Sequence, residues 1–497
     1  MTIEKIISVV KRNNPKVDLD MIRLAYEYAA DAHKGQKRMS GEDYMQHSLE
    51  TTYALAKMNI DLPTVLAGLL HDVPEDTERT LKDIEKNFGK EVAGLVEGIT
   101  KLGTIKYRGL ERYAENLRKM FVAMAEDVRV LFIKFADRIH NLKTLDALPP
   151  VKQQRIARES LEIYAPIAAR LGMDELKGEI EDLAFPYVYP EEYEWIRKIS
   201  KKKYEEQKKF TNKVIRIIKR ELDKDKDVKI IKIEGRAKRY YSLYRKILRK
   251  DMDIDRIYDL VALRIIVKNV ADCYHVLGII HKLWKPMPGR IKDYIAQPKP
   301  NGYSSLHTSV FGPDGRLTEF QIRTQKMHDE AEWGIAAHWT YKEDGIKGKF
   351  KNGKNGHKVR KDKLKWIKGL LEEQEKVTTT KRYLNALKLD FFKNRIFVFT
   401  PKGDVIDLPE NAVSIDFAYH IHTEVGHHCT GAKINEKMAT LQTPLKSGDM
   451  VEIITDKGRK GPSEGWLSIV QTHLAKNKIK QYFSKEKKIN LFKLFNR

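Results

Sequence analysis

Apolar residues recur at helical spacing through the first 195 residues of the chain. In MIRLAYEYAADAH, TVLAGLL, VAGLVEGITKL and LRKMFVAMAEDVRVLFIKFADRIHNL, hydrophobic side chains return every three or four positions. Few alternating β-branched runs interrupt them. The pattern predicts one all-helical domain over residues 1–195.

The pattern changes after about residue 200. VKIIKIEG, LVALRIIVK, SSLHTSVF and LTEFQIRT are short, partly alternating and bounded by Gly, Pro, Asn or Asp, which indicates strands. YHVLGIIHKLW and HDEAEWGIAAHWTYKE favour helices. We therefore expect a mixed α/β domain over residues 196–345.

A basic linker and a small module complete the chain. Residues 347–365 contain nine Lys or Arg, one acid and three glycines, which predicts a flexible linker over 346–388. RIFVFTPKGDVIDLPENAVSIDFAYHIHTEVG and MVEIITD predict strand, turn, strand, helix and a later strand, hence a β-rich module over 389–456. Residues 457–497 read as the start of a helical region.

Composition narrows the class of protein. With 497 residues and 41% hydrophobic content the chain is long enough for about three globular domains. Two cysteines favour a reducing cytosol. The polar N-terminus and the lack of an apolar run of about 18 residues predict a cytoplasmic protein without a membrane span.

The net charge of +24 predicts a polyanionic partner, either nucleic acid or nucleotide phosphates. Residues 201–250 contribute much of the excess. For residues 201–224 the alternative is a solvated helix face without a ligand.

Four potential metal ligands follow apolar helical runs. In AGLLHDVPEDT, His71 and Asp72 directly follow an apolar run that is expected to be buried. His47 in EDYMQHSLE and Asp137 in FIKFADRIHNL also lie at the edge of an apolar helical run. Buried carboxylates need a partner, and imidazole with carboxylate suits Mn²⁺, Fe²⁺ or Zn²⁺. The alternative is a helix end whose acids face water.

The middle of the chain predicts a second phosphate site. Seven of the seventeen residues of EGRAKRYYSLYRKILRK are basic and alternate with tyrosines, which fits either nucleic acid or a triphosphate. Asp259 lies at the mouth of one predicted strand, and Glu319 and Gln321 share a face of another. Two carboxylates beside a basic cluster favour Mg²⁺ and phosphate transfer.

GQKRMSGEDYMQH, LLHDVPEDT and FADRIHNLKT resemble the hydrolase domain of the long RelA/SpoT-type alarmone synthetase/hydrolases. The resemblance implies that His47, His71, Asp72 and Asp137 hold Mn²⁺, and that Glu75 and Asp76 assist the attack of water on the 3′-pyrophosphate of (p)ppGpp. It implies a nucleotide pocket lined by Arg38, Ser40, Tyr44, Asn141 and Thr144.

Pro74 departs from the aliphatic residue usual between the HD and ED pairs of that family. Proline disfavours helical geometry at the preceding residue and removes a backbone donor. We expect that the helix either ends at the metal ligands or kinks and re-aims Glu75 and Asp76.

GRAK, YDLVALR, RIKDYIAQPKPNGYSSLHT and EFQIRT resemble the synthetase domain of the same family, which implies a nucleotidyltransferase-like fold. The implied reaction transfers pyrophosphate from ATP to the 3′-hydroxyl of GDP or GTP. Asp259 would coordinate Mg²⁺, and Glu319 would activate the hydroxyl and share the ion. The implied nucleotide contacts are Arg236, Lys238, Ser242 and Lys246 on ATP, with Arg290, Lys292, Tyr294, Lys299, Asn301, Tyr303, His307 and Gln321 around the acceptor and Tyr303 on guanine.

The module at 389–456 resembles a TGS domain, a β-grasp fold. In that family the domain senses the 3′ end of uncharged tRNA on the ribosome, which implies a tRNA contact for His422. A zinc site is an alternative explanation of a local cluster, His420, His422, His427, His428 and Cys429. Family members continue beyond the point where this chain stops, so we expect weaker ribosome docking.

The predicted function is therefore a bifunctional alarmone enzyme with reciprocal switching between synthesis and hydrolysis. The basic RIKD at 290–293 is the version found in bifunctional members. Three alternatives remain: a hydrolase-dominant enzyme with weak synthesis, a non-catalytic ribosome- or RNA-binding regulator, and an HD nucleotidase for other nucleotides.

Overall fold

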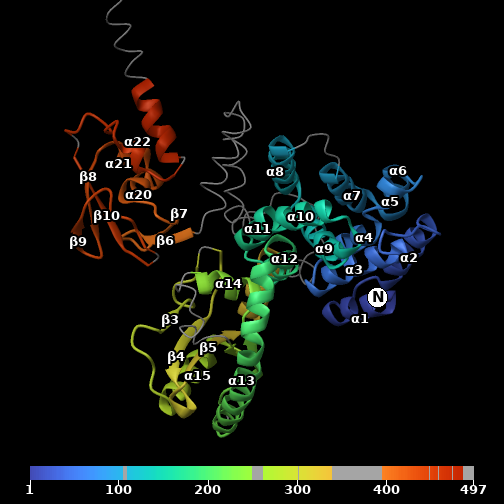
Figure 1. Cartoon of the computed structure of the whole chain (residues 1–497), viewed down its shortest axis with the longest axis horizontal. Helices are drawn as coiled ribbons and strands as arrows, with labels where there is room; N and C mark the ends of the chain where they lie inside the picture. The colour runs from blue at the N-terminus through green and yellow to red at the C-terminus, as the bar shows by residue number, and fades with distance from the viewer. Residues whose placement is uncertain are drawn as a thin grey trace, which may run out of the picture. The chain divides into compact units, whose positions relative to one another are not determined.

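Two compact units make up the chain, Met1–Gln374 and Glu375–Arg497 (Figure 1). The computed structural model describes residues 1–103, 109–225, 227–248, 261–299, 301–338, 395–446, 448–456, 458–472 and 474–484. The linker predicted at 346–388 lies outside these residues. We describe each unit by itself.

The first part of unit one is helical, as the sequence predicts. Within the described residues up to 195, the regular elements are all helices. The helices are α1 (Ile3–Asn13), α2 (Leu19–Ala32), α3 (Tyr44–Lys57), α4 (Leu62–Leu70), α5 (Val73–Asp76), α6 (Leu81–Phe88), α7 (Lys90–Gly103), α8 (Gly109–Glu126), α9 (Arg129–Lys143), α10 (Pro150–Glu159), α11 (Ala165–Arg170), α12 (Asp174–Val188) and α13 (Pro190–Leu222). Because α13 runs through residue 195 without a break, the domain limit there stays a prediction.

Helix α4 is buried on all sides. Each residue from Thr64 to Leu70 is buried, as expected for a helix that is apolar all round. A Cβ atom at Gly68 would lie 2.6 Å from Leu55 Cδ1, so the glycine lets α3 and α4 approach closely. This approach brings His47 of α3 next to His71, with ring centroids 5.2 Å apart.

A mixed sheet forms the second part of unit one. Its strand order is β1-β2-β5-β4-β3, with β2 and β5 parallel and the other neighbours antiparallel. The elements are β1 (Ile230–Ala237), α14 (Tyr240–Leu248), β2 (Val261–Val267), α15 (Val270–Leu283), β3 (Lys292–Asp293), β4 (Leu306–Phe311), β5 (Leu317–Thr324) and α16 (Gln325–Trp333). Helices α13 and α15 pack against the sheet and against each other, and this confirms the predicted mixed α/β class.

The helix predicted from HDEAEWGIAAHWTYKE is broken. Helix α16 ends at Trp333, and a 3₁₀ turn follows over Gly334–His338. Gly334 has a φ of +55°, and a Cβ there would lie 2.2 Å from the carbonyl oxygen of Leu171. The turn therefore packs directly on the backbone between α11 and α12.

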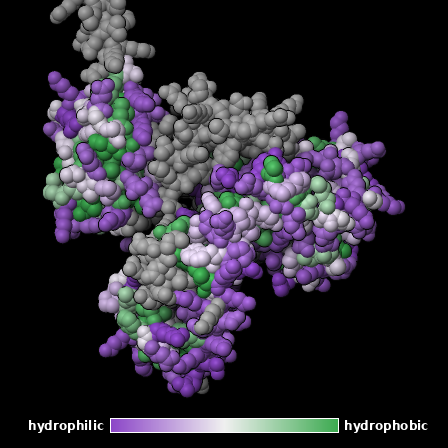
Figure 2. Space-filling model, in the orientation of Figure 1, coloured by the Kyte–Doolittle hydropathy of each residue, from purple (hydrophilic) through white to green (hydrophobic). Residues whose placement is uncertain are grey.

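The basic run at 201–224 forms part of α13. Phe210, Val214, Ile218 and Leu222 are buried in the core beneath the sheet, and most of the lysines between them are exposed. Figure 2 shows hydrophilic residues over the visible side of this helix. The run is a solvated helix face with one apolar stripe.

Unit two contains two small sheets, β6-β7 and β10-β8-β9, with helices packed on them. The elements are β6 (Arg395–Phe399), β7 (Val405–Pro409), α20 (Ser414–Ile421), α21 (Thr423–His427), β8 (Cys429–Ile434), β9 (Lys437–Ala439), β10 (Val451–Thr455) and α22 (Trp466–Ile469). A parallel bridge from Phe399 to Met450 links the two sheets. In the described residues of either unit we find no helix with the length and hydropathy that a bilayer crossing demands.

Arg129 ties three helical segments together. Its guanidinium is almost fully buried and lies 2.8 Å from Asp61 Oδ2, 2.6 Å from Glu91 Oε1 and 2.6 Å from Asp127 Oδ2. Asp61 also accepts a hydrogen bond from the backbone of Thr64 at the start of α4. Removing the cation would leave the carboxylates without their shared partner.

We therefore expect Arg129→Ala to lower the free energy of unfolding of unit one by about 3 kcal/mol. Urea denaturation followed by circular dichroism measures the change. Arg158→Ala is the matched control, because Arg158 is exposed on α10 and its loss should change stability by less than about 0.5 kcal/mol. Equal midpoints for the two variants would contradict the role assigned to Arg129.

Candidate functional site

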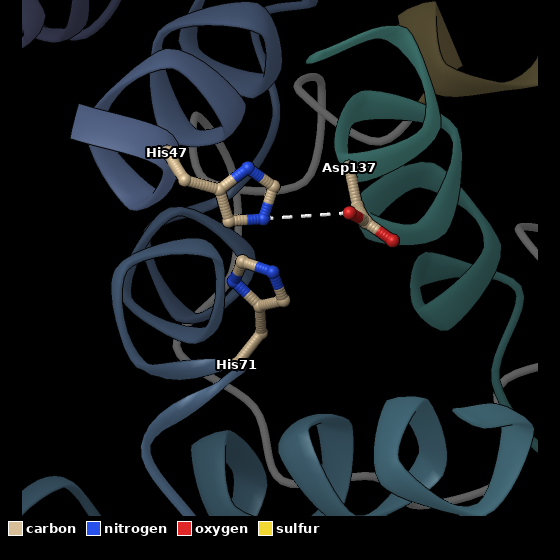
Figure 3. A group of neighbouring side chains, drawn as sticks. All are labelled: His47, His71 and Asp137. Carbon is tan, nitrogen blue, oxygen red and sulfur yellow. Dashed lines mark ion pairs between the residues drawn. The ribbon is translucent and has the colours of Figure 1, made fainter. Parts of the chain in front are cut away.

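Polar ligand groups from three helical segments meet inside the helical region. His47 lies in α3, His71 follows the last residue of α4, and Asp137 lies in α9. One possible ligand atom from each lies within 4.8 Å of the others, and all three residues are buried (Figure 3). Figure 3 shows the His47 and His71 rings next to each other, with the Asp137 carboxylate facing them from the opposite helix.

Asp72 is the fourth member predicted from the sequence, and it adjoins this group. His47 Nε2 lies 3.3 Å from Asp72 Oδ2 and 3.4 Å from Asp137 Oδ1, and His71 Nε2 lies 3.2 Å from Asp72 Oδ1. The structure thus brings together all four residues that the sequence singles out as metal ligands. They come from positions up to 90 residues apart in the chain.

The hydrogen bonds of His71 leave one ring nitrogen for a ligand. Its Nδ1 lies 2.9 Å from the carbonyl oxygen of Gly68, which can only accept, so Nδ1 carries the proton. Nε2 therefore has the lone pair, and this buried atom makes no hydrogen bond. Two imidazoles and two carboxylates form a donor set suited to a first-row divalent cation.

Charge compensation keeps the acids ionised. Burial alone would raise the pKa of Asp137, but Lys134, whose Nζ lies 2.8 Å from Asp137 Oδ2, and His47 hold that pKa well below its ordinary value. Burial also acts to raise the pKa of Asp72, and His71 and His47 lower it instead. The group therefore presents two carboxylates rather than carboxylic acids.

A cavity of about 540 Å³ opens beside this group. All five residues predicted as the nucleotide pocket line it: Arg38, Ser40, Tyr44, Asn141 and Thr144. Four further cations that the sequence reasoning missed line it too: Lys37, Lys134, Arg138 and Arg155. The cavity suits a ligand with several negative charges.

Pro74 ends the helix at the ligands, the first of the two predicted outcomes. Helix α4 stops at Leu70, and the single turn α5 begins at Val73 with Pro74 among its first residues.

Tyr44 contacts the acids around this turn. Its hydroxyl lies 3.0 Å from Asp72 Oδ2, to which it can donate, and it is also within hydrogen-bond distance of Asp76. Burial and the charge of Asp72 raise the pKa of Glu75.

A second group of predicted residues gathers on the mixed sheet. Strand pairing sets His307 of β4 opposite Gln321 of β5, with Glu319 two residues away on the same face. Gln321 Nε2 donates to Glu319 Oε1 at 3.2 Å, and His307 Nδ1 lies 3.6 Å from that oxygen. Asp259, the partner predicted for Glu319, lies outside the described residues.

The loop before β4 folds around two tyrosines. Lys299 Nζ lies 4.7 Å and 4.9 Å from the ring centroids of Tyr294 and Tyr303. The Tyr303 hydroxyl and His307 Nε2 are 2.7 Å apart, and Asn301 Oδ1 accepts from the backbone of Tyr303. Lys292 joins this group through strand pairing with His307, whereas Arg290 is exposed at the start of the loop.

The cations predicted to bind ATP lie at the edge of the same sheet. Arg236 is near the end of β1, Lys238 follows β1, and Ser242 and Lys246 lie in α14. Arg236 Nη2 is 3.0 Å from Glu175 Oε2 of α12, and its Nη1 is 3.4 Å from Glu332 Oε1 of α16. Arg236 is thus already paired with carboxylates.

In unit two, His422 is exposed between α20 and α21, where its Nδ1 accepts from the backbone of Glu424. The other histidines of the local cluster have separate partners. His420 Nδ1 contacts the Asp416 carbonyl, His427 Nδ1 the Tyr419 hydroxyl, and His428 Nδ1 the Glu424 carbonyl.

Three family models match this chain in order. One described as an HD domain matches residues 25–174, one described as a region found in RelA / SpoT proteins matches 235–346, and one described as a TGS domain matches 396–455. A relative from Escherichia coli (strain K12), named bifunctional (p)ppGpp synthase/hydrolase SpoT, is 43% identical over 96% of this chain and 67% of its own length. The chain belongs to the RelA/SpoT family.

Other relatives of the RelA/SpoT family are longer than this chain. A GTP pyrophosphokinase of Streptomyces coelicolor is 45% identical over 98% of this chain but only 58% of its own length. The chain thus spans about three fifths of that curated relative. A solved structure of a metazoan ortholog of SpoT matches 33% of this chain and 84% of its own length at 24% identity, with a TM-score of 0.24.

A polar stripe on α9 could have revealed two of the residues that sequence reasoning missed in this RelA/SpoT chain, Lys134 and His140. Lys134, His140 and Asn141 each lie three or four positions from Asp137, which places them on the same face of the helix. His140 Nδ1 lies 2.8 Å from His47 Nδ1, and burial together with His47 and Arg38 lowers the pKa of His140 to about 3. His140 is therefore neutral at physiological pH.

If the group around His47 binds a cation, the cation should stabilise the folded chain. We expect saturating Mn²⁺ to raise the free energy of unfolding by about 2.7 kcal/mol when its concentration is roughly 100 times Kd. Differential scanning calorimetry with and without Mn²⁺ measures the shift in Tm. His71→Ala should abolish the shift and His428→Ala should retain it, whereas a shift that survives in His71→Ala would place the cation elsewhere.

Proposed function

We propose that this chain is a bifunctional alarmone enzyme. It transfers pyrophosphate from ATP to the 3′-hydroxyl of GDP or GTP to make (p)ppGpp, and it hydrolyses (p)ppGpp to GDP or GTP and pyrophosphate. The observation that carries the proposal is the presence of two separate sites in unit one. One is the group around His47, which could hold a metal ion and lies beside a cavity lined by cations. The other is Glu319, a carboxylate on the mixed sheet with basic residues near it. The names of the relatives, which include both activities, support it.

In the hydrolase site, His47, His71, Asp72 and Asp137 hold Mn²⁺. The bound ion would supply positive charge and activate water. Arg38 and the other cations of the cavity bind the phosphates of (p)ppGpp and stabilise the negative charge that grows in the transition state. Glu75 takes the proton of the attacking water, for which a pKa raised toward neutrality is favourable.

The remaining hydrolase residues position the substrate and the acids. The Tyr44 hydroxyl lies within hydrogen-bond distance of Asp72 and Asp76 and has one proton to share between them, so it keeps the two carboxylates close to each other. Ser40, Asn141 and Thr144 bring hydroxyl and amide groups to the cavity wall, where they can bind the ribose or the phosphates.

In the synthetase site, Glu319 accepts the proton of the 3′-hydroxyl, and Glu319 and Asp259 would hold Mg²⁺. The ion would supply positive charge against the phosphates of ATP. Tyr303 stacks on guanine, with Lys299 close to its ring. The remaining nucleotide contacts are those predicted from the sequence, Arg236, Lys238, Ser242 and Lys246 on ATP and Arg290, Lys292, Tyr294, Asn301, His307 and Gln321 around the acceptor.

Unit two contributes a contact with uncharged tRNA on the ribosome. His422 is exposed, and its Nδ1 accepts a hydrogen bond from the backbone of Glu424. In the neutral ring the proton is therefore on Nε2, which can donate to the RNA. We also propose the domain limits predicted from the sequence, with the hydrolase over 1–195, the synthetase over 196–345 and the TGS domain over 389–456.

Two reactions on one purified chain test the proposal. ATP and GDP with Mg²⁺ should give ppGpp, and ppGpp with Mn²⁺ should give GDP and pyrophosphate, as resolved by anion-exchange chromatography. His71→Ala should lower only hydrolysis and Glu319→Gln only synthesis, each by about 10²- to 10⁴-fold. Glu205→Gln, an exposed change on α13, is the control for the second variant.

The alternatives give different products. A hydrolase-dominant enzyme would show only the second reaction at a substantial rate. A non-catalytic regulator would show neither, and an HD nucleotidase would release phosphate from other nucleotides without forming ppGpp.

We further propose that the helical domain restrains the synthetase site. Glu175 lies in the first turn of α12 and pairs with both Arg236 and Arg239. Burial raises the pKa of Asp174, its neighbour, against the lowering effect of Lys177 and Lys299. Glu175 of the helical domain thus occupies Arg236, a cation that we assign to the phosphates of ATP, and ATP must displace it.

Glu175→Gln should therefore lower the KM for ATP in ppGpp synthesis by about 3- to 10-fold, because the competing charge is gone while the half-exposed pair is weak. Steady-state kinetics measures KM, and the rate of hydrolysis should stay unchanged. Glu191→Gln, in the first turn of α13, is the matched control. A higher KM in Glu175→Gln would mean that Glu175 orients Arg236 for ATP instead.

A further inference from the structure

Arg38 contacts two residues that in turn contact the metal-capable group. Its Nη1 lies 3.0 Å from His140 Nδ1, and its Nη2 donates to Asn141 Oδ1 at 2.6 Å. His140 Nδ1 is also 2.8 Å from His47 Nδ1, and Asn141 Nδ2 donates to Asp137 Oδ1 at 2.5 Å. The Arg38 guanidinium is therefore connected to His47 through His140 and to Asp137 through Asn141.

The chemistry of these contacts fixes the proton on His47. A guanidinium can only donate, so His140 Nδ1 must accept from Arg38 and carries no proton. His47 Nδ1 lies 2.8 Å from the same atom, so it is a second donor that shares the single lone pair of His140 Nδ1 with Arg38. His47 therefore keeps a proton on Nδ1, and Nε2, the atom that lies 3.3 Å from Asp72 and 3.4 Å from Asp137, is the nitrogen that can exchange its proton for a cation.

The second arm fixes the amide of Asn141 in the same way. Because Arg38 needs an acceptor, the amide oxygen of Asn141 faces Arg38 and the amide nitrogen faces Asp137. A flipped amide would place two donors against each other on one side and two acceptors on the other. The Asp137 carboxylate is thereby held by Asn141 on one oxygen and by Lys134 on the other.

We propose that Arg38 is a positioning residue of the metal site, which sets the proton position of His47 through His140 and the orientation of Asp137 through Asn141. The proposal rests on the proposed hydrolase function. It gives Arg38 a role before any nucleotide binds, in addition to its place in the cavity wall. Without Arg38, His140 can carry its proton on Nδ1 and donate to His47, whose Nε2 would then be protonated and unable to bind a cation.

Metal binding without nucleotide separates this role from substrate binding. We expect Arg38→Ala to weaken Mn²⁺ binding by about 10- to 100-fold, measured by isothermal titration calorimetry and by the electron paramagnetic resonance signal of free Mn²⁺. A charge effect alone has the opposite sign, because removing a nearby cation reduces repulsion and should tighten binding. Unchanged or tighter binding in Arg38→Ala would overturn the proposal.

Arg155→Ala is the matched control. Arg155 lines the same cavity and is exposed, so its removal deletes the same charge from the cavity wall without touching the relay. We expect Mn²⁺ binding to stay within about twofold of the original chain or to tighten slightly. An equal weakening in both arginine variants would contradict a specific role for Arg38.

Variants of His140 test the relay independently of the arginine. His140→Ala removes the acceptor and should weaken Mn²⁺ binding to a similar extent. His140→Asn places an oxygen acceptor where Nδ1 stood and should restore most of the affinity, an outcome that simple loss of packing would not give. A failure of His140→Asn to improve on His140→Ala, with both variants folded by circular dichroism, would contradict the relay.

The same titration distinguishes the two proposals. If the original chain binds no Mn²⁺ and hydrolyses no ppGpp, the proposed hydrolase function fails. If it binds Mn²⁺ and hydrolyses ppGpp while Arg38→Ala binds the ion equally well, only the relay fails.

Discussion

The helical domain depends on four polar side chains that are held away from water. The carboxylates of Asp72 and Asp137 must stay ionised there, and the imidazoles of His47 and His71 must carry their protons on the correct nitrogens. Removing such groups from water costs several kcal/mol unless each has a partner. Lys134 compensates Asp137 from one turn away, and the backbone of Gly68 binds the far nitrogen of His71. The packing follows from the same requirement, because α3 and α4 can approach closely enough only where Gly68 has no side chain.

Much of this group could be predicted from the sequence because each ligand follows an apolar helical run. Periodicity identifies the buried face of a helix, and a histidine or aspartate at its edge stands out. An interruption near the ligands was also predicted from Pro74, although the sequence left open whether α4 would end or kink there. Spacing places both Lys134 and His140 on the face of Asp137, but it does not reveal that His140 meets His47, which lies 93 residues earlier in the chain.

The sheet illustrates a different limit of sequence reasoning. Alternation identified β2, β4 and β5, but not their order, and the pairing that sets His307 beside Glu319 and Gln321 depends on contacts between strands. The break at Gly334 arises from the nearby carbonyl of Leu171, more than 160 residues earlier in the chain. Likewise, Arg236 was predicted as a ligand of phosphate, but its pairing with Glu175 exists only in the folded chain.

The two sites therefore begin from opposite electrostatic conditions. The helical site contains acids that gain from an added cation, whereas the proposed synthetase site contains Arg236, which Glu175 and Glu332 already neutralise in part. Glu332 also contacts the buried Arg264 and Arg323, and Arg236 together with these two arginines lowers its pKa to about 2, so it stays charged. Glu175 differs because it belongs to α12, outside the sheet, and is half-buried. Of the two carboxylates on Arg236, Glu175 is thus the one that we propose a nucleotide displaces, which would give the two proposed activities a physical reason to oppose each other.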